Sequence, residues 1–259
     1  MIRIESLSAT FGADTPNPVT ALDDITLGIA EREFVVVIGS NGSGKSTLLN
    51  VLAGTVRPRR GRVLIGNTDA TRLQAHERAR LVGRVFQNPF SGTAPAMTVA
   101  ENLRLAELRG VPKGLHRRLD ARRIGEYRGH VAELGMGLED RMGTAIGLLS
   151  GGQRQALTLL MATLRRPEIL LLDEHTAALD PGSAEQVLRL TDRLIERHRL
   201  TAMMVTHDMN EAARFGNRLL MMNAGRIVLD AAGQEKQALT PGSLLERFAE
   251  QRAAVAHAH

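Results

Sequence analysis

Apolar runs of strand length alternate along the chain with segments of helical periodicity, and this alternation is typical of an α/β fold. Residues 35–38, 169–172 and 202–205 are apolar throughout. Strands that lack polar alternation are typical of a parallel sheet covered on both faces. The pattern therefore predicts a mostly parallel sheet, with further short strands at residues 62–66 and 82–86.

The beginning of the chain shows a different pattern. Residues 2–5 alternate apolar and charged side chains, and residues 21–29 repeat this alternation more loosely after a turn-rich piece at 12–18. We interpret the two runs as strands of an antiparallel sheet at the edge of the fold. Phe11 ends the first strand, where it either fills the core or offers an aromatic face on which adenine could stack.

A charged helical block follows residue 97. Thr98 is a candidate N-cap, and Glu101 three residues later completes a capping box. Residues 99–109 and 115–134 then carry few strand signals, so we expect an inserted helical subdomain. Its arginines form a basic face, either a solvated surface or a contact with a partner or lipid headgroups: Arg117, Arg118, Arg122, Arg123 and Arg128.

The pattern in the last third of the chain predicts further helices and a hairpin. A helix from Pro181 to Arg199 has Asp180 as its N-cap. Residues 218–222 and 226–230 flank a turn at 223–225 as a hairpin. A final helix runs from Pro241 to about Gln251, and the tail beyond it, with His257 and His259, is expected to fray rather than to bind a metal.

The chemistry is concentrated directly after the first buried strand, in the motif G-x-x-x-x-G-K-[ST]. Its glycines permit the positive φ angles that turn successive backbone N–H groups inward, and the following helix adds its positive end. A polyphosphate fits there: Lys45 should reach the β- and γ-phosphates, the Ser46 hydroxyl should bind Mg²⁺, and Thr47 should lie near the α-phosphate. The loop consists of Gly39, Ser40, Asn41, Gly42, Ser43, Gly44, Lys45, Ser46 and Thr47.

Polar residues also stand at the C-terminal ends of two of the predicted buried strands. Asp173 and Glu174 end the run at 169–172, where Asp173 is expected to serve Mg²⁺ and Glu174 to face the γ-phosphate and its attacking water. Carboxylates at strand ends are otherwise often only caps. His207 follows the run at 202–205, as either a core residue or a contact to a ligand.

A second glycine-containing turn opens the helix predicted at residues 156–164. Ser150, Gly151, Gly152 and Gln153 present backbone N–H groups and a hydroxyl, which are the ingredients of an anion site or of an ordinary N-cap.

The amino-acid composition excludes several classes of protein. The 259 residues include no Cys, which excludes disulfides and thiolate sites, and no apolar run approaches the ~18 residues of a membrane span. The N-terminus lacks a continuous apolar core, so we expect a soluble, cytoplasmic protein. The formal charge of +5 suits anionic partners, but one Tyr and no Trp argue against a single-stranded nucleic-acid platform.

Taken together and in order, the motifs resemble those of ATP-binding cassette ATPases over nearly the whole chain. They are the phosphate loop, Gln87 after a strand, residues 149–153, the acidic strand end, residues 178–180 and His207. The resemblance implies an α/β P-loop NTPase fold with a mostly parallel sheet and an antiparallel β edge subdomain. Residues 1–96 and 148–259 would form the nucleotide-binding core, and residues 97–147 the helical subdomain.

The resemblance also implies a role for each motif. Two cassettes would face head to tail around two ATP molecules, with the phosphate loop of one opposite Ser150 and Gly152 of the other. Asp180 would communicate across this dimer. Within one site Lys45, Ser46, Thr47 and Asp173 would hold MgATP, Gln87 would contact the metal, Glu174 would be the general base, His207 would hold the γ-phosphate and Phe11 would stack on adenine.

Such cassettes energise membrane transporters from the cytoplasmic face of the inner membrane. The implied partners are transmembrane permease subunits, a second copy of this chain and, indirectly, a solute-binding protein, with no direct contact to nucleic acid. His175 departs from the family, which most often has proline there. Residues 173–180 with 92–95 resemble a subgroup of amino-acid importers, for tryptophan or another aromatic amino acid. The alternatives are an exporter or lipoprotein-release ATPase, and a soluble cassette acting on DNA or ribosomes.

Overall fold

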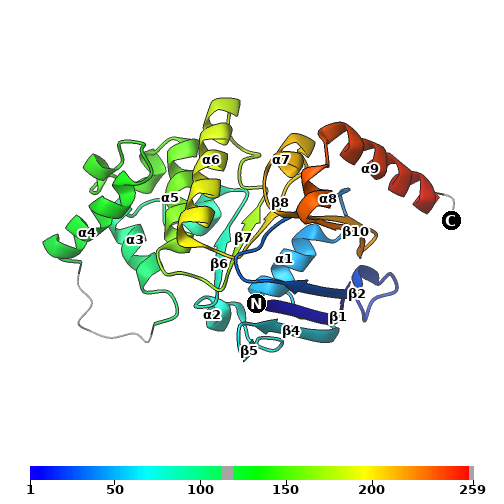
Figure 1. Ribbon diagram of the computed structural model, residues 1–259. Coiled ribbons are helices and arrows are strands. Elements are labelled where there is room, and N and C mark those ends of the chain that lie inside the picture. Colours follow the sequence, from blue (N-terminus) through cyan, green and yellow to red (C-terminus); the bar gives the residue numbers. More distant parts are fainter. Residues whose placement is uncertain (112–118, 257–259) are drawn as a thin grey trace. The chain divides into compact units, whose positions relative to one another are not determined.

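A computed structural model describes residues 1–111 and 119–256, and the side chains of residues 1–111 and 119–250. The predicted helix start at residue 115, Arg117, Arg118, His257 and His259 lie outside the described residues. The chain divides into two compact units, Met1–Ala75 with Leu200–His259, and His76–Arg199. Each combines strands and helices, which confirms the α/β fold class (Figure 1).

The first unit contains the predicted antiparallel edge sheet. Its strand order is β2-β1-β4-β5, formed by β2 (Val19–Ile29), β1 (Ile2–Phe11), β4 (Arg60–Ile65) and β5 (Thr68–Asp69). Strand β1 alternates buried and exposed side chains and pairs with β2 on one side and β4 on the other. The alternation in the sequence therefore arises from a sheet with one buried face.

The same unit contains the strand that precedes the phosphate loop. Strand β3 (Phe34–Gly39) is buried at every residue and runs parallel to both β8 (Ala202–Val205) and β9 (Arg218–Asn223). Strand β10 (Arg226–Ala232) completes the predicted hairpin with β9. The helices of this unit are α1 (Lys45–Ala53), α7 (Met209–Arg214), α8 (Gly233–Gln237) and α9 (Pro241–Ala256).

The second unit is built around a parallel strand pair and a buried helix. Strands β6 (Val82–Val85) and β7 (Ile169–Asp173) are in register from Val82 opposite Ile169 to Val85 opposite Leu172. The helix α5 (Gly151–Thr163) is buried from Arg154 to Ala162. The remaining helices are α2 (Ala75–Arg78), which begins in the first unit, α3 (Val99–Glu107), α4 (Ala121–Ala132) and α6 (Pro181–His198), with 3-10 turns at Pro89–Gly92, Glu139–Arg141 and Ile146–Leu148.

The local helix signals are confirmed. Thr98 caps α3 and forms the predicted capping box with Glu101, and Asp180 caps α6 with Pro181 in its first turn. The predicted helical block at 97–147 lies within the second unit, beside β6 and β7, and its separation as a subdomain stays a prediction. Elements α2, α7, α8 and β5 were not predicted, because the three helices are too short to show helical periodicity and β5 has only two residues.

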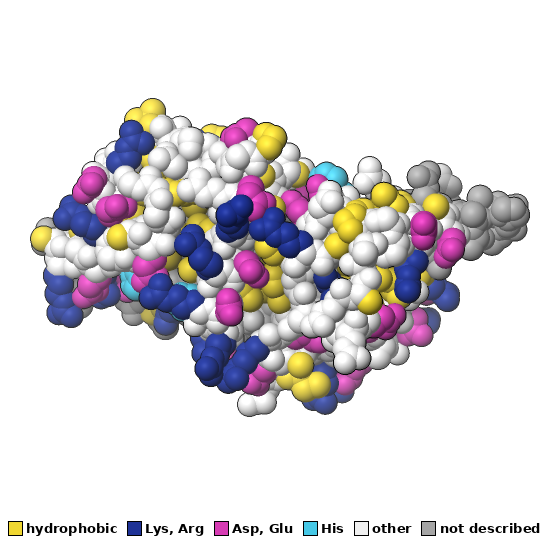
Figure 2. Space-filling view, turned by 45° about the horizontal axis from the view of Figure 1, so that its top comes forward, with side chains coloured by type: hydrophobic (Ala, Val, Ile, Leu, Met, Phe, Trp, Pro, Cys, Tyr) yellow, Lys and Arg dark blue, Asp and Glu magenta, His cyan; other side chains and the backbone are white. Residues whose placement is uncertain are grey.

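Two surface properties bear on function. Within residues 1–111 and 119–256, no helix has both the length and the apolar character needed to cross a bilayer. On the face shown in Figure 2, arginine and lysine side chains are interleaved with aspartate and glutamate. The positive charge is therefore not gathered into one basic face in that view.

His175 belongs to the core of the second unit. It is 2% exposed, and its Nε2 lies 3.0 Å from the Thr191 hydroxyl on α6. Burial disfavours the charged imidazolium and lowers the pKa of His175 from 6.5 to about 4. The side chain is therefore a neutral packing residue at neutral pH.

We expect His175 to make the folded protein sensitive to acid. The unfolded chain takes up a proton at this histidine below about pH 6.5, whereas the folded chain takes it up only near pH 4. The free energy of unfolding therefore falls as the pH is lowered between these two values. The loss is at most about 1.4 kcal/mol per pH unit. Above pH 6.5 this contribution is constant. Urea unfolding across this range should show a steeper pH dependence for the unmodified protein than for His175→Gln; equal slopes would contradict the assignment.

Candidate functional site

The predicted site residues fall into two sets, one in each unit. In the first unit, β3 ends at Gly39, and the chain passes through the phosphate loop into α1. The three loop glycines have φ angles of 157°, 79° and 102° at Gly39, Gly42 and Gly44. Helix α1 begins at Lys45 with Gly44 as N-cap, and no described side chain caps it. Its first backbone N–H groups therefore face the loop without a side-chain acceptor, which is a favourable place for phosphate oxygens.

The loop is clamped by neighbouring backbone. A Cβ at Gly44 would lie 2.4 Å from the Ala21 carbonyl oxygen of β2, and a Cβ at Gly39 would lie 2.4 Å from the Met222 carbonyl oxygen of β9. Gly225, in the turn between β9 and β10, donates its N–H to the Ser43 carbonyl oxygen at 3.1 Å. The sequence motif did not indicate that the C-terminal hairpin supports the phosphate loop.

Lys45 lies inside the loop that it follows. Its side chain is 6% exposed, and Nζ donates hydrogen bonds to the carbonyl oxygens of Gly39 at 2.8 Å and Ser40 at 2.9 Å. The Ser43 hydroxyl is also buried, with no hydrogen-bond partner among the described residues. Ser46 is exposed and Thr47 half-buried. The loop thus combines an ammonium group, a helix start and hydroxyl groups around one concave backbone.

His207 and Phe11 belong to the same unit as the loop. Val37 of β3 pairs with Val205 of β8, and the Thr206 N–H donates to the Val37 carbonyl oxygen at 3.2 Å. The two strands therefore end at one edge, so His207 follows β8 where the loop follows β3. His207 is exposed, which does not fit the core alternative. Phe11 is 46% exposed, so the core-filling alternative does not fit it either.

In the second unit, Gln87 and Glu174 leave the strand pair at one edge. Each lies two residues beyond the paired residues Val85 and Leu172. Glu174 has a φ angle of 43°, in the left-handed region that a residue with a Cβ rarely adopts. Such strain at the end of a strand is a feature of functional sites.

Asp173 has a partner that the sequence analysis missed. Arg84 of β6 donates from Nη2 to Oδ2 of Asp173 at 3.0 Å, and both side chains are less than one-fifth exposed. The available signal was an arginine within a buried strand, at the position opposite Leu171. A single carboxylate with a hydroxyl and phosphate oxygens is a usual Mg²⁺ donor set, so the chemistry of Asp173 and Ser46 suits this ion. No described cluster of three or more His, Cys, Asp or Glu residues could hold a metal by itself.

The turn at Ser150 is an N-cap. The Ser150 hydroxyl accepts the Gln153 N–H at 3.2 Å, and the Gln153 Oε1 accepts the Ser150 N–H at 3.2 Å, which forms a capping box at the start of α5. A hydroxyl that accepts this bond still carries a hydrogen that can be donated. The ordinary N-cap reading is therefore confirmed without excluding an anion contact, because Ser150 is exposed.

The start of α5 contacts the segment around Asp180. A Cβ at Gly151 would lie 3.1 Å from the Leu179 side chain, and a Cβ at Gly152 would lie 2.9 Å from the Ser183 Cβ. The Ser183 N–H donates to the Asp180 carboxylate at 3.0 Å, and hydrogen bonds from Ser183 lower the pKa of Asp180. The structure thus brings Gly151, Gly152 and Asp180 together.

Comparison with known proteins identifies a family. The model of the ABC transporter family matches residues 22–177, more than half of the chain. A tyrosine transport ATP-binding protein of Clostridioides difficile (strain R20291) is 41% identical over 96% of this chain and 98% of its own length. An aliphatic sulfonates import ATP-binding protein of Burkholderia cenocepacia (strain HI2424) is 35% identical over 89% of this chain and 64% of its own length.

Solved structures agree. One is a dimeric ATP-binding cassette in a post-hydrolysis state bound to ADP and phosphate, with a TM-score of 0.75, 28% identity and coverage of 90% of this chain and 98% of that chain. Another is the ADP conformation of an ATP-binding cassette of an ABC transporter, with a TM-score of 0.79, 25% identity and 98% coverage of both chains.

We expect Gly44→Ala to destabilise the protein more than Gly42→Ala, because neighbouring backbone packs closely against the phosphate loop at Gly44. Gly44→Ala and Gly42→Ala share the strain of a left-handed φ angle, about 1 kcal/mol, but only the first brings a methyl group against backbone; nothing lies within 4 Å of a Cβ at Gly42. Urea unfolding without nucleotide should show a larger loss for Gly44→Ala, and ATP should bind that variant more weakly than the unmodified protein. Equal losses of stability would show that the Ala21 contact does not hold the loop.

Proposed function

This chain belongs to the ABC transporter family, and on that premise we propose that it energises an importer of amino acids or similar small solutes. It is an ATP-binding subunit whose hydrolysis of ATP is coupled to transport. The observation that carries the amino-acid proposal is the 41% identity to a tyrosine transport ATP-binding protein over nearly the full length of both chains. The direction is supported by the relative that is named as an import protein.

The substrate proposal has a second support in the chain itself. Residues 173–180 and 92–95 resemble the subgroup that works with amino-acid permeases. We infer a tryptophan-like or other aromatic amino acid as cargo. Its recognition belongs to the permease and a solute-binding protein, because the described chain supplies the energy and not the path across the membrane.

The phosphates of ATP would bind at the start of α1. Lys45 is already held among the loop carbonyl groups, so it supplies a positive charge there with little rearrangement. The adenine would stack on the exposed ring of Phe11. Ser46, Asp173 and Gln87 would hold Mg²⁺, which neutralises charge on the phosphate oxygens when bound.

Asp173 would share its carboxylate between this ion and Arg84. The guanidinium occupies Oδ2 at 3.0 Å, which leaves Oδ1 as the oxygen available to a cation. The ion pair also fixes the orientation of the carboxylate at the end of β7. Arg84 therefore acts as a positioning residue for Asp173 in this proposal.

Glu174 would accept a proton from the water that attacks the γ-phosphate. Its left-handed φ angle ends the extended backbone of β7 at the edge where Gln87 also emerges. His207 would donate a hydrogen bond to the γ-phosphate. Both groups act in the transition state, where charge develops on the phosphoryl oxygens.

A second copy of the chain would complete each site. Ser150, Gly151, Gly152 and Gln153 would present the start of α5 to the nucleotide of the partner copy, and Asp180 would sense that contact from the start of α6. A related cassette with 28% identity is dimeric with ADP and phosphate bound. We infer that the dimer associates with permease subunits at the cytoplasmic face of the membrane and has no direct contact with nucleic acid.

The role of Glu174 predicts a specific defect. Glu174→Gln keeps the size and the hydrogen-bonding capacity of the side chain but cannot accept the proton, so hydrolysis should fall by about a hundredfold or more while ATP binding is retained. Chromatography with ATP should show an accumulated dimer. Glu168→Gln, an exposed residue just before β7, is the control and should hydrolyse ATP normally. Undiminished turnover of Glu174→Gln would refute the assignment.

The transport proposal is tested by the proteins that accompany this chain. We would purify it from gently solubilised membranes of its source and identify the associated proteins by mass spectrometry. A permease with a solute-binding protein is expected, and binding of aromatic amino acids to the latter would define the cargo. A permease without a binding protein would instead indicate an exporter or lipoprotein release, and ribosomes or DNA without a membrane protein would indicate a soluble cassette.

A further inference from the structure

A large cavity lies in the second unit, lined by the ends of α3 and α5 and by α4. Its volume is about 880 Å³, which is in the range of small-molecule sites. Six arginines line it, against two carboxylates, those of Glu107 and Glu126. The arginines are Arg80, Arg104, Arg109, Arg123, Arg165 and Arg166.

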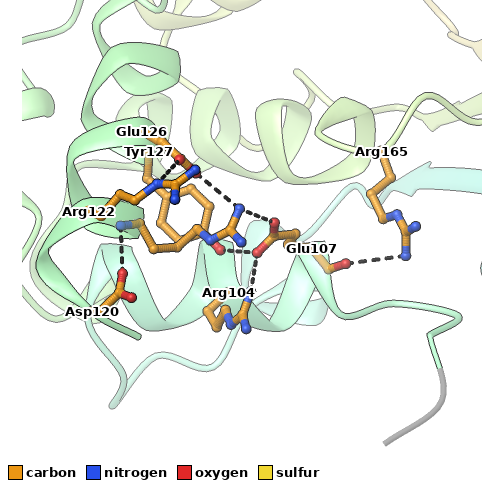
Figure 3. Close-up of polar contacts among 8 residues, drawn as sticks. Arg104, Glu107, Asp120, Arg122, Glu126, Tyr127 and Arg165 are labelled. Atoms are coloured by element: carbon orange, nitrogen blue, oxygen red, sulfur yellow. Dashed lines mark hydrogen bonds and ion pairs between the residues drawn. The ribbon is translucent and has the colours of Figure 1, made fainter. Parts of the chain in front are cut away.

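Both carboxylates already accept hydrogen bonds from other residues that line the cavity. Figure 3 shows the Glu107 side chain between α3 and α4, where it accepts hydrogen bonds from Arg104 and from the Tyr127 hydroxyl. Arg123 donates to Glu107 at 2.9 Å and to Glu126 at 3.0 Å. This network neutralises Arg104 and Arg123 and leaves no other carboxylate in the lining.

The other four arginines have no carboxylate partner in the part of the chain that the structure describes. Arg109 donates to the Ala162 carbonyl oxygen at 3.1 Å, and Arg165 donates to two backbone carbonyl oxygens at 3.3 and 3.4 Å. Residues 112–118, which follow this region in the chain, contain no Asp or Glu. Among the residues that line the cavity, the only carboxylates are those of the two glutamates, and both are engaged with Arg104 and Arg123.

The backbone brings two of these arginines, Arg80 and Arg109, close together. Gly110 has a φ angle of 69°, and a Cβ there would lie 2.6 Å from the Cβ of Arg80, so the turn after α3 places Arg80 beside Arg109. The Nε of Arg109 is buried and has no hydrogen-bond partner among the described residues. Burial first, and the charge of Arg165 second, lower the pKa of Arg109. A buried donor beside like charges is unfavourable unless an anion joins it.

We propose that this cavity binds a small anion bearing phosphate groups, held by Arg80, Arg109 and Arg165. A guanidinium fork matches two phosphate oxygens, and several forks around one cavity favour a polyphosphate over a single carboxylate. The ligand is either a free phosphorylated solute or the headgroup of an anionic lipid. The proposal does not rest on the transport function, because all of the residues concerned lie in the second unit away from the phosphate-loop sequence.

The test measures binding of inorganic tripolyphosphate by titration calorimetry. All proteins would carry Lys45→Ala, so that the phosphate loop does not compete for the probe. Arg80→Gln with Arg165→Gln should weaken binding by about tenfold or more, because two charge-assisted donors are lost. The control is Arg141→Gln with Arg189→Gln, which removes the same charge from exposed arginines of the same unit outside the lining.

Three results would overturn the proposal: no binding of the probe at millimolar concentration, equal weakening in both double variants, or unchanged binding in the first. If the first double variant unfolds at a lower temperature, Arg80→Gln alone is compared with Arg141→Gln alone.

A second arm distinguishes the source of the phosphate. The same proteins would be sedimented with phosphatidylglycerol vesicles and with phosphatidylcholine vesicles. Loss of binding to the anionic vesicles in Arg80→Gln with Arg165→Gln, and not in the control, would assign the phosphate to a lipid headgroup. An effect on tripolyphosphate alone would assign it to a soluble ligand, and unchanged tripolyphosphate binding would refute the site whatever the vesicles show.

Discussion

The first unit depends on the close approach of backbone to backbone at Gly39 and Gly44. Carbonyl oxygens of β9 and β2 lie 2.4 Å from the place that a Cβ would take at these two residues. A carbonyl group within a sheet cannot move aside as a side chain can, so the loop has little freedom to adopt another shape. Its concave form is therefore established by the two flanking strands before any phosphate arrives, and less ordering is needed when nucleotide binds.

The second unit depends instead on strand register. The pairing of β6 with β7 determines that Arg84 faces the Asp173 carboxylate and that Gln87 and Glu174 emerge together. A shift by one residue would turn every side chain of one strand to the opposite face. The polar residues of this unit thus owe their positions to the apolar residues that hold the strand pair in place, among them Val85 and Leu172.

The features that the sequence predicted are local ones. The phosphate loop, the capping box at Thr98, the N-cap alternative at Ser150 and the proline start of α6 each arise from residues within a few positions of one another. The missed features join distant residues. The support of Ser43 by Gly225 and the pairing of Arg84 with Asp173 depend on how strands are placed side by side, which no pattern in one segment specifies. The arginine cavity is of the same kind, since its wall comes from three helices.

The contact between Gly152 and Ser183 has a mechanical consequence. Because Gly152 lacks a Cβ, the starts of α5 and α6 approach so closely that an added methyl group would lie 2.9 Å from the Ser183 Cβ. Ser150 and Asp180 cap these two helices directly beside that contact. A bulkier residue at position 152 would therefore act as a wedge that separates the two caps.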